Sequence, residues 1–129
     1  MSLILLVDDD VDFCRMLRTT LEHKGHQVIE AHDGKAAMQQ AGRAPVDLVL
    51  IDLIMPDQEG LETIQQLRRL LPNLKIIAMS AGVQGRPKDV LKAAQLLGAM
   101  QCLAKPFSAD ELESALDAAF AANPGDGPH

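Results

Sequence analysis

Short unbroken runs of apolar residues alternate along the chain with longer segments in which apolar residues recur every three or four positions. Unbroken runs are typical of strands buried on both faces of a parallel sheet, and the three-to-four spacing is typical of amphipathic helices. The pattern therefore predicts alternating strands and helices. The predicted strands cover residues 3–7, 27–31, 48–51, 75–79 and 100–103, and the predicted helices cover residues 11–24, 34–42 and 61–71, a segment after residue 87 and a segment from residue 108.

Residues with preferences for helix ends mark where several of these helices begin and stop. Asp10 is a good N-cap for the first helix, and Gly25 is a typical C-terminal stop. Ser108 and Glu111 have the spacing of a capping box at the start of the last helix. The helix over residues 61–71 ends before a proline.

Five strand–helix units in succession predict an α/β fold, a parallel sheet with helices on both faces. The expected architecture is a doubly wound, flavodoxin-like (βα)5 domain with strand order 2-1-3-4-5. In that order the strands over residues 3–7 and 48–51 are neighbours, and their connections leave toward opposite faces. A ligand crevice is therefore expected at their C-terminal ends.

Composition limits the domain organisation and the class of partner. The 129 residues suit one domain of ordinary size; we expect the domain over residues 1–122 and a flexible tail over residues 123–129, with no output domain. The net charge of −6 and the lack of a basic cluster argue against a direct nucleic-acid or membrane partner.

The chain has no signal-peptide pattern and no run near the ~20 apolar residues of a membrane span. We expect a cytoplasmic protein in which Cys14 and Cys102 are reduced core residues.

Acidic residues follow two of the strands that are expected to be neighbours. Asp52 ends the buried run over residues 48–51, and Asp8, Asp9 and Asp10 follow the first strand. An aspartate at a strand end is often only a turn cap, and Asp10 is explained as an N-cap. Asp8 and Asp9 then remain beside Asp52, where carboxylates repel one another unless a cation neutralises them. Mg²⁺ fits best, because it binds one or two carboxylates and keeps waters for a phosphate.

Two more polar residues follow the last two strands at the same edge. Ser80 and Lys105 each have an ordinary interpretation, as a local cap and as a solvated side chain. Together with the acids, they add a hydroxyl donor and a cation that could bind phosphoryl oxygens. The combination favours a site for a covalent aspartyl phosphate at Asp52.

Four short motifs carry a resemblance to a known family. They are LVDDD at residues 6–10, IDLIMP at residues 51–56 with Gly60, MSA at residues 79–81, and AKPF at residues 104–107. In this order and at these strand ends, the chain resembles the receiver domain of bacterial two-component response regulators, of the single-domain chemotaxis-regulator type. The resemblance covers about residues 3–122.

The resemblance implies that Asp52 accepts a phosphoryl group from the phosphohistidine of a histidine kinase or a histidine phosphotransfer protein. Ser80 and Lys105 would then contact the phosphoryl group. The new charge would alter binding of a downstream protein through the face formed by the helix after residue 87, the strand over residues 100–103 and the helix from residue 108. Such a module is a signalling domain and not an enzyme that releases a product.

The resemblance also assigns the metal ligands and one unusual peptide bond. Mg²⁺, or Mn²⁺ in its place, would be bound by Asp9, Asp52 and the main-chain carbonyl of Ile54, with Asp8 acting mainly through a bound water. The bond between Lys105 and Pro106 would be cis.

The chain departs from the family pattern at two places. Receivers usually carry an aromatic residue three positions before the lysine, and this chain has Cys102 there. The loop over residues 82–87 is glycine-rich and long. We therefore expect an activation signal to pass through that loop and the helix after it, with Cys102 as a small apolar filler.

Two alternative functions fit part of this pattern. A Mg²⁺-dependent phosphatase of the haloacid-dehalogenase type also uses a strand-end aspartate, but it needs a second aspartate two residues later, where this chain has Ile54. A receiver-like module that binds partners without phosphate would not need the full set of acids, hydroxyl and lysine.

Several other polar residues are interpreted as surface positions. The histidines at 23, 26 and 32 do not have the spacing of metal ligands along the chain and are expected on helix and loop surfaces. Arg68 and Arg69 are expected on a solvated face of the helix over residues 61–71.

Overall fold

The computed structural model describes residues 2–53, 59–81 and 87–122. Across these residues strands and helices alternate as the apolar pattern predicts. Two boundaries matter for function: the last strand extends to Lys105, and the third helix begins at Glu59. In chain order the elements are β1 (Leu3–Val7), α1 (Val11–His23), β2 (Gln27–Ala31), α2 (Gly34–Arg43), β3 (Leu48–Asp52), α3 (Glu59–Leu70), β4 (Lys75–Ala81), α4 (Pro87–Leu96), β5 (Gln101–Lys105) and α5 (Ala109–Ala121).

The strands form one parallel sheet with the order β2-β1-β3-β4-β5, which confirms the predicted topology. β3 lies at the centre, between β1 and β4. Val7 pairs with Ile51, and Asp52 pairs with Met79. The residues that follow β1, β3 and β4 therefore lie side by side at the C-terminal edge of the sheet.

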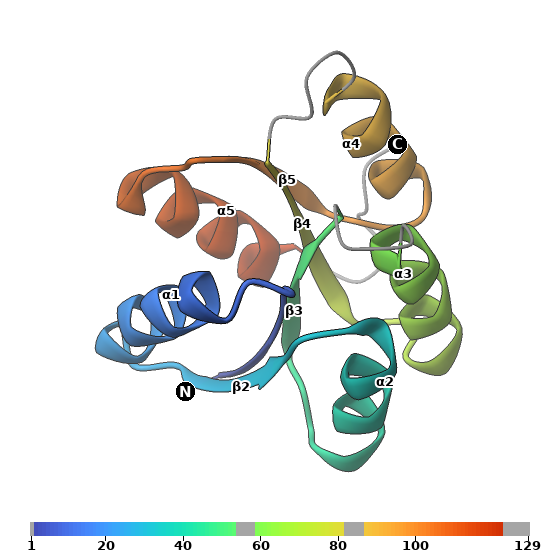
Figure 1. Cartoon of the computed structure of the whole chain (residues 1–129), viewed down its shortest axis with the longest axis horizontal. Coiled ribbons are helices and arrows are strands. Elements are labelled where there is room, and N and C mark those ends of the chain that lie inside the picture. Colours follow the sequence, from blue (N-terminus) through green and yellow to red (C-terminus); the bar gives the residue numbers. More distant parts are fainter. Residues whose placement is uncertain (1, 54–58, 82–86, 123–129) are drawn as a thin grey trace.

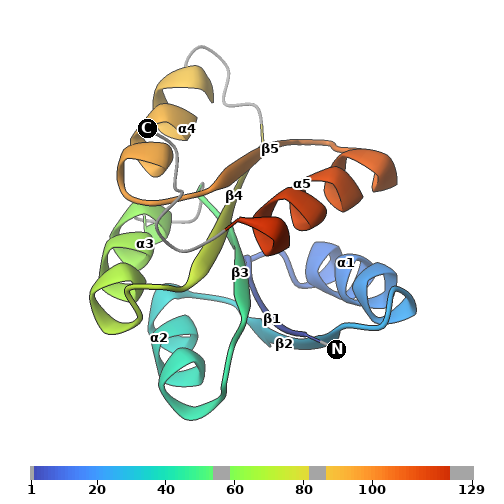
Figure 2. The ribbon, with the colours of Figure 1, turned by 180° about the vertical axis from the view of Figure 1, so that it is seen from behind.

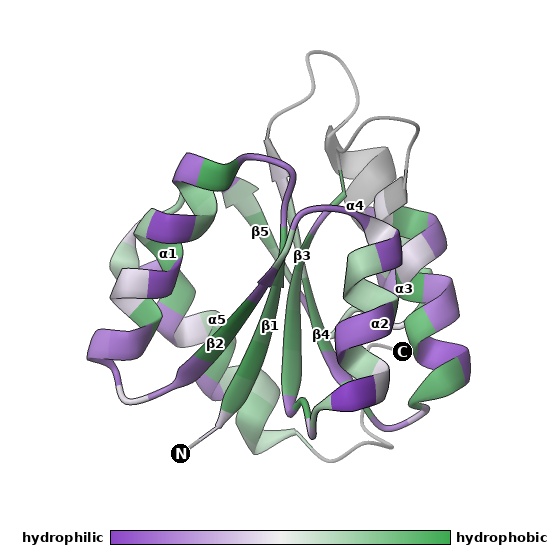
Figure 3. Cartoon of the chain, turned by 60° about the horizontal axis from the view of Figure 1, so that its bottom comes forward, coloured by the Kyte–Doolittle hydropathy of each residue, from purple (hydrophilic) through white to green (hydrophobic). Residues whose placement is uncertain are grey.

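Helices cover both faces of the sheet (Figures 1 and 2). α1 and α5 cover one face, and α2, α3 and α4 cover the other. Alternation along each strand divides the core accordingly: Ile4 and Leu6 pack with α1 and α5, whereas Leu5 and Val7 pack against the opposite helices. In Figure 3 the strands are hydrophobic along most of their length, and polar residues gather on the helices.

Several helix ends agree with the sequence signals. The Asp10 side chain accepts a hydrogen bond from the Phe13 N–H, and Ser108 and Glu111 form the predicted capping box. Gly25 follows α1 with a φ of +93°, which disfavours a side chain.

Arg68 is a correction to the sequence interpretation, because it is not on a solvated face. Its guanidinium donates hydrogen bonds to the carbonyls of Pro72, Leu74 and Gly98, at distances of 2.7, 2.7 and 2.8 Å. Burial also lowers its pKa. The carbonyls that follow α3 and α4 need donors, and the five N–H groups of one arginine can serve several of them. Arg69, by contrast, is exposed as expected.

Gly60 allows α3 to begin directly against the end of β3. A Cβ atom at this position would lie 2.6 Å from both the Asp52 carbonyl oxygen and the Leu53 Cα, far inside van der Waals contact. Any side chain would therefore push α3 away from the strand that ends in Asp52.

We predict that Gly60→Ala lowers the free energy of unfolding by about 1–3 kcal/mol, because the added methyl group overpacks this contact. Gly42→Ala is the matched control: nothing lies within 4 Å of a Cβ there, within α2. Alanine in that exposed helical position should stabilise the protein by about 0.5–1 kcal/mol. Urea unfolding of both variants measures the difference, and equal effects would contradict the packing argument.

Candidate functional site

Asp52 is held at the centre of the C-terminal edge by the burial of its strand. The four residues before it, Leu48–Ile51, are fully buried, and Asp52 itself is 4% exposed. An apolar strand between two helical layers therefore ends in a nearly buried carboxylate. This is the position predicted for the phosphoryl acceptor.

The structure brings the predicted acids together. One carboxylate oxygen from each of Asp8, Asp9 and Asp52 lies within 4.8 Å of the others. Asp8 is fully buried and Asp9 is exposed, so the cluster is open to solvent at Asp9. Hard oxygen donors at this spacing suit a divalent cation such as Mg²⁺.

Among the described residues, Lys105 provides the positive charge that pairs with this acidic cluster. Its Nζ lies 2.5 Å from Asp8 Oδ2 and 3.4 Å from Asp52 Oδ2. The predicted cis peptide between Lys105 and Pro106 is confirmed. The ammonium group also lies 3.9 Å from the centre of the Phe13 ring, which is a cation–π contact. The sequence does not predict this contact, because no local spacing relates Phe13 to Lys105.

The charge balance and the bonding of Asp8 distinguish the roles of the acids. Lys105 offsets one of the three carboxylate charges, which leaves the cluster negative. Asp8 Oδ2 faces Lys105, and Asp8 Oδ1 accepts a hydrogen bond of 3.0 Å from the Asp10 N–H. Both oxygens of Asp8 are therefore engaged, whereas Asp9 lies at the solvent side. This favours Asp9 over Asp8 as a direct ligand of a cation.

Ser80 reaches the same edge from β4. It follows Met79, the partner of Asp52 in the sheet, and it is paired with Ala104, the neighbour of Lys105. Its side chain is buried, at 1% exposure. The structure therefore brings five of the predicted site residues to one edge: Asp8, Asp9, Asp52, Ser80 and Lys105. Ile54, the fourth predicted metal ligand, lies outside the described residues.

The main chain of Asp8 makes two contacts that the sequence did not suggest. Its carbonyl oxygen lies 3.4 Å from the Cys14 Sγ, which donates to it, and 3.0 Å from the His32 Nδ1. Cys14 is confirmed as a buried thiol. The contacts depend on how α1 and β2 pack beside β1, which no local pattern reveals.

Cys102 takes the place expected for an aromatic side chain. It is half-buried and packs against the core cluster on the α2, α3 and α4 face, whereas Leu103 belongs to the opposite cluster. Burial raises the pKa of its thiol. The predicted alternation along β5 is confirmed, but residues 82–86 of the neighbouring loop lie outside the described part of the chain.

The family model of the response regulator receiver domain matches residues 4–117. The chain belongs to this family. The fold, the strand order and the signalling role expected of a receiver are thereby established.

Individual relatives agree with this assignment. The chain is 38% identical over 113 residues to the transcriptional regulatory protein CpxR homolog of Haemophilus influenzae, a match that covers 87% of this chain and 47% of that protein. Its structure resembles chemotaxis protein CheY4 of Vibrio cholerae, with a TM-score of 0.81 at 29% identity over 92% of this chain and 98% of that one. It also resembles response regulator TrrA of Thermotoga maritima, solved with Mg²⁺ and BeF, with a TM-score of 0.77 at 29% identity over 91% and 97% of the two chains.

The receiver spans about half or less of the length of the curated relatives it matches. Those relatives are transcriptional regulatory proteins, so the expected lack of a nucleic-acid partner concerns this chain alone and stays a prediction. Among the described helices, none has the length and apolarity needed to cross a bilayer.

The pair formed by Lys105 and Asp8 generates a stability prediction. Their side chains are 14% and 0% exposed. Lys105→Met should lower the free energy of unfolding by about 3 kcal/mol without Mg²⁺, because it leaves a buried carboxylate without its cation. Adding Asp8→Asn should recover at least about 1 kcal/mol of that loss. Denaturant unfolding of the two single variants and the double variant measures this coupling.

Lys24→Met is the control for this cycle. Lys24 pairs with Glu113 at 3.3 Å on the surface, with 27% and 58% of the two side chains exposed. Loss of such an exposed pair should cost about 0–1 kcal/mol. Strictly additive effects of the Lys105 and Asp8 substitutions would show that the short contact does not stabilise the fold.

Proposed function

We propose that Asp52 of this receiver domain accepts a phosphoryl group from the phosphohistidine of a histidine kinase or a histidine phosphotransfer protein. The observation that carries the proposal is the setting of the Asp52 carboxylate. It ends the central strand, lies 3.4 Å from the Lys105 ammonium group, and has oxygens of Asp8 and Asp9 within 4.8 Å. A nucleophile, a cation and further acids for a metal thus meet at one edge.

In the proposed transfer, a carboxylate oxygen of Asp52 attacks the phosphorus atom of the phosphohistidine. The P–N bond breaks, and its electron pair stays with the imidazole of the donor. The Lys105 ammonium group pairs with a phosphoryl oxygen, and Asp8 holds that lysine in place through the 2.5 Å contact. The Ser80 hydroxyl donates to another phosphoryl oxygen.

The residues present fit a divalent cation, which we assign as Mg²⁺ or, in its place, Mn²⁺. Asp9 and Asp52 would bind it directly, and Asp8 would act through a bound water. The resemblance to receiver domains adds the main-chain carbonyl of Ile54, which lies outside the described residues, as a further ligand. The excess of carboxylates over lysine in the cluster supports this assignment. When bound, the ion offsets negative charge on the phosphoryl oxygens.

The transferred dianion alters the balance between two packings of the domain, and a downstream protein reads the change at the face of α4, β5 and α5. Cys102 lies on β5 in this region, packed toward the α2, α3 and α4 side. The module works in the cytoplasm, binds no nucleic acid itself and releases no small-molecule product, so its output is a change in protein binding.

The first test is phosphorylation by a small acyl phosphate in the presence of Mg²⁺. Intact-mass spectrometry should show one phosphoryl group on the wild type and none on Asp52→Asn, because an amide is a far weaker nucleophile. Asp12→Asn removes the same charge from an exposed residue of α1 and should be labelled normally. Undiminished labelling of Asp52→Asn would overturn the proposal, and multiple-turnover hydrolysis of a free phosphomonoester would indicate a phosphatase instead.

The second test separates the two acids after β1. Asp8→Asn should weaken Mg²⁺ binding by about 10–100-fold, as expected for a residue that acts through an outer contact. Asp9→Asn should weaken Mg²⁺ binding further, because this substitution removes a carboxylate that binds the ion directly. Calorimetric titration of both variants with Mg²⁺ measures this order, and a larger loss in Asp8→Asn would contradict the assigned roles.

A further inference from the structure

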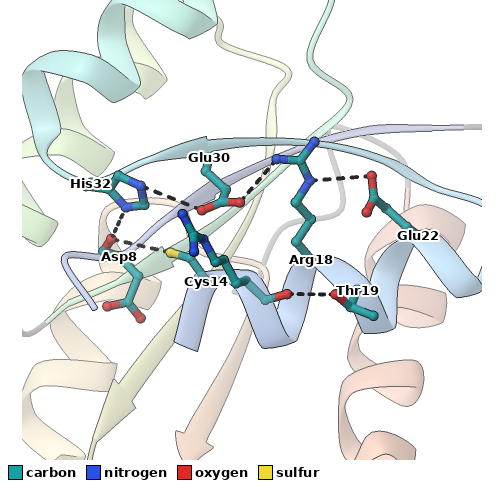
Figure 4. Close-up of polar contacts among 8 residues, drawn as sticks. Asp8, Cys14, Arg18, Thr19, Glu22, Glu30 and His32 are labelled. Carbon is teal, nitrogen blue, oxygen red and sulfur yellow. Dashed lines mark hydrogen bonds and ion pairs between the residues drawn. The ribbon is translucent and has the colours of Figure 1, made fainter. Parts of the chain in front are cut away.

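A second group of side chains that could bind a metal ion lies on the far side of the Asp8 main chain (Figure 4). Cys14 comes from α1, Glu30 from β2, and His32 follows β2. One ligand atom from each of the three lies within 4.8 Å of the others. The sulfur, oxygen and nitrogen donors differ from the carboxylates of the phosphorylation site, and the receiver function does not account for them.

His32 has the orientation and the ring tautomer of a metal-binding histidine. Its Nδ1 lies 3.0 Å from the Asp8 carbonyl oxygen, which can only accept, so Nδ1 carries the ring proton. A neutral ring then has its lone pair on Nε2, which lies 3.6 Å from Glu30 Oε1. Histidine ligands of metals usually donate their other N–H to a carbonyl or carboxylate in this way.

The Glu30 carboxylate is also oriented by an ion pair with Arg18. Arg18 Nη1 lies 3.2 Å from Glu30 Oε2, so the arginine fixes one carboxylate oxygen while the other, Oε1, faces His32. Only 14% of the Glu30 side chain is exposed. An outer contact of this kind orients a carboxylate ligand before any ion arrives.

Cys14 supplies the third donor from the buried side. Its Sγ lies 3.4 Å from the same Asp8 carbonyl that accepts from His32. Burial raises the pKa of the thiol to about 12, with the Asp8 and Glu30 carboxylates adding to the effect. A metal ion that binds the sulfur displaces the thiol proton to solvent.

We propose that Cys14, Glu30 and His32 form a binding site for a divalent transition metal of the zinc class. The ligands are the Cys14 thiolate, Glu30 Oε1 and His32 Nε2, and water takes the fourth position. Mixed sulfur, nitrogen and oxygen donors suit Zn²⁺ and its spectroscopic substitute Co²⁺, whereas Mg²⁺ prefers oxygen donors alone. The partly exposed His32 and Glu30 give the ion a path from solvent.

This proposal departs from two sequence interpretations. Spacing along the chain suggested that His32 is not a ligand and that Cys14 is only a core residue. The pairing of Val7 with Ala31 in the sheet places the residues after both strands at the same level, where α1 brings Cys14 beside them. The group is therefore formed by tertiary packing and has no signature in local spacing.

The test is titration of the reduced protein with Co²⁺ in saturating Mg²⁺, so that the acidic cluster is already occupied. One equivalent of Co²⁺ should produce a thiolate-to-cobalt charge-transfer band in the near ultraviolet. Cys14→Ser should abolish the band, and Cys102→Ser, which removes the other thiol, should retain it. His32→Gln should weaken binding at least about tenfold, the smallest loss usual for a metal-site partner.

Three results would overturn the proposal: no band in the wild type, an unchanged band in Cys14→Ser, or loss of the band in Cys102→Ser. Circular dichroism shows whether each variant is folded. Should Cys14→Ser fail to fold, His32→Gln decides the matter, because His32 is exposed and its substitution leaves the core intact. Unchanged Co²⁺ affinity in His32→Gln would then refute the site.

Discussion

The repulsion among the carboxylates at the C-terminal edge of the sheet is the constraint on which this domain depends. Asp8 and Asp52 are almost completely removed from water, Asp9 lies beside them, and Lys105 offsets part of their charge. Charges in such a place are costly unless they are paired. The folded protein tolerates them because Lys105 pairs with Asp8 and Asp52, and because burial of the apolar strands offsets the remaining cost. The remaining negative charge attracts a divalent cation, and that cation together with Lys105 can offset the charge of a phosphoryl group.

The sheet fixes the site through burial on both faces. Because helices cover each face, the central strands are apolar along their length, and the chain can place polar groups only where the strands end. Parallel pairing brings these ends together, so residues far apart in sequence converge on one edge. Gly60 allows α3 to start against the Asp52 main chain, and Arg68 ties the turns that follow α3 and α4.

Much of this arrangement could be predicted from the sequence, because the relevant information is local. Apolar runs define the strands, polar residues at their ends define the site, and parallel topology places Asp8, Asp52 and Lys105 together. The same logic could not find the buried contacts of Arg68, since these join turns that no pattern relates. Nor could it find the contacts of Cys14 and His32 with the Asp8 carbonyl, which depend on the packing of α1 against the sheet. Direct roles for Ser80 and for the carbonyl of Ile54 stay predictions.

The central claim is that Asp52 itself forms the acyl phosphate. Borohydride reduces an aspartyl phosphate to homoserine and leaves unmodified aspartate unchanged, so it marks the acceptor residue permanently. Protein treated with an acyl phosphate and Mg²⁺, then reduced and digested, can be sequenced by tandem mass spectrometry. This account predicts homoserine at position 52 and aspartate at positions 8 and 9. Homoserine at position 8 or 9, with aspartate kept at position 52, would contradict it.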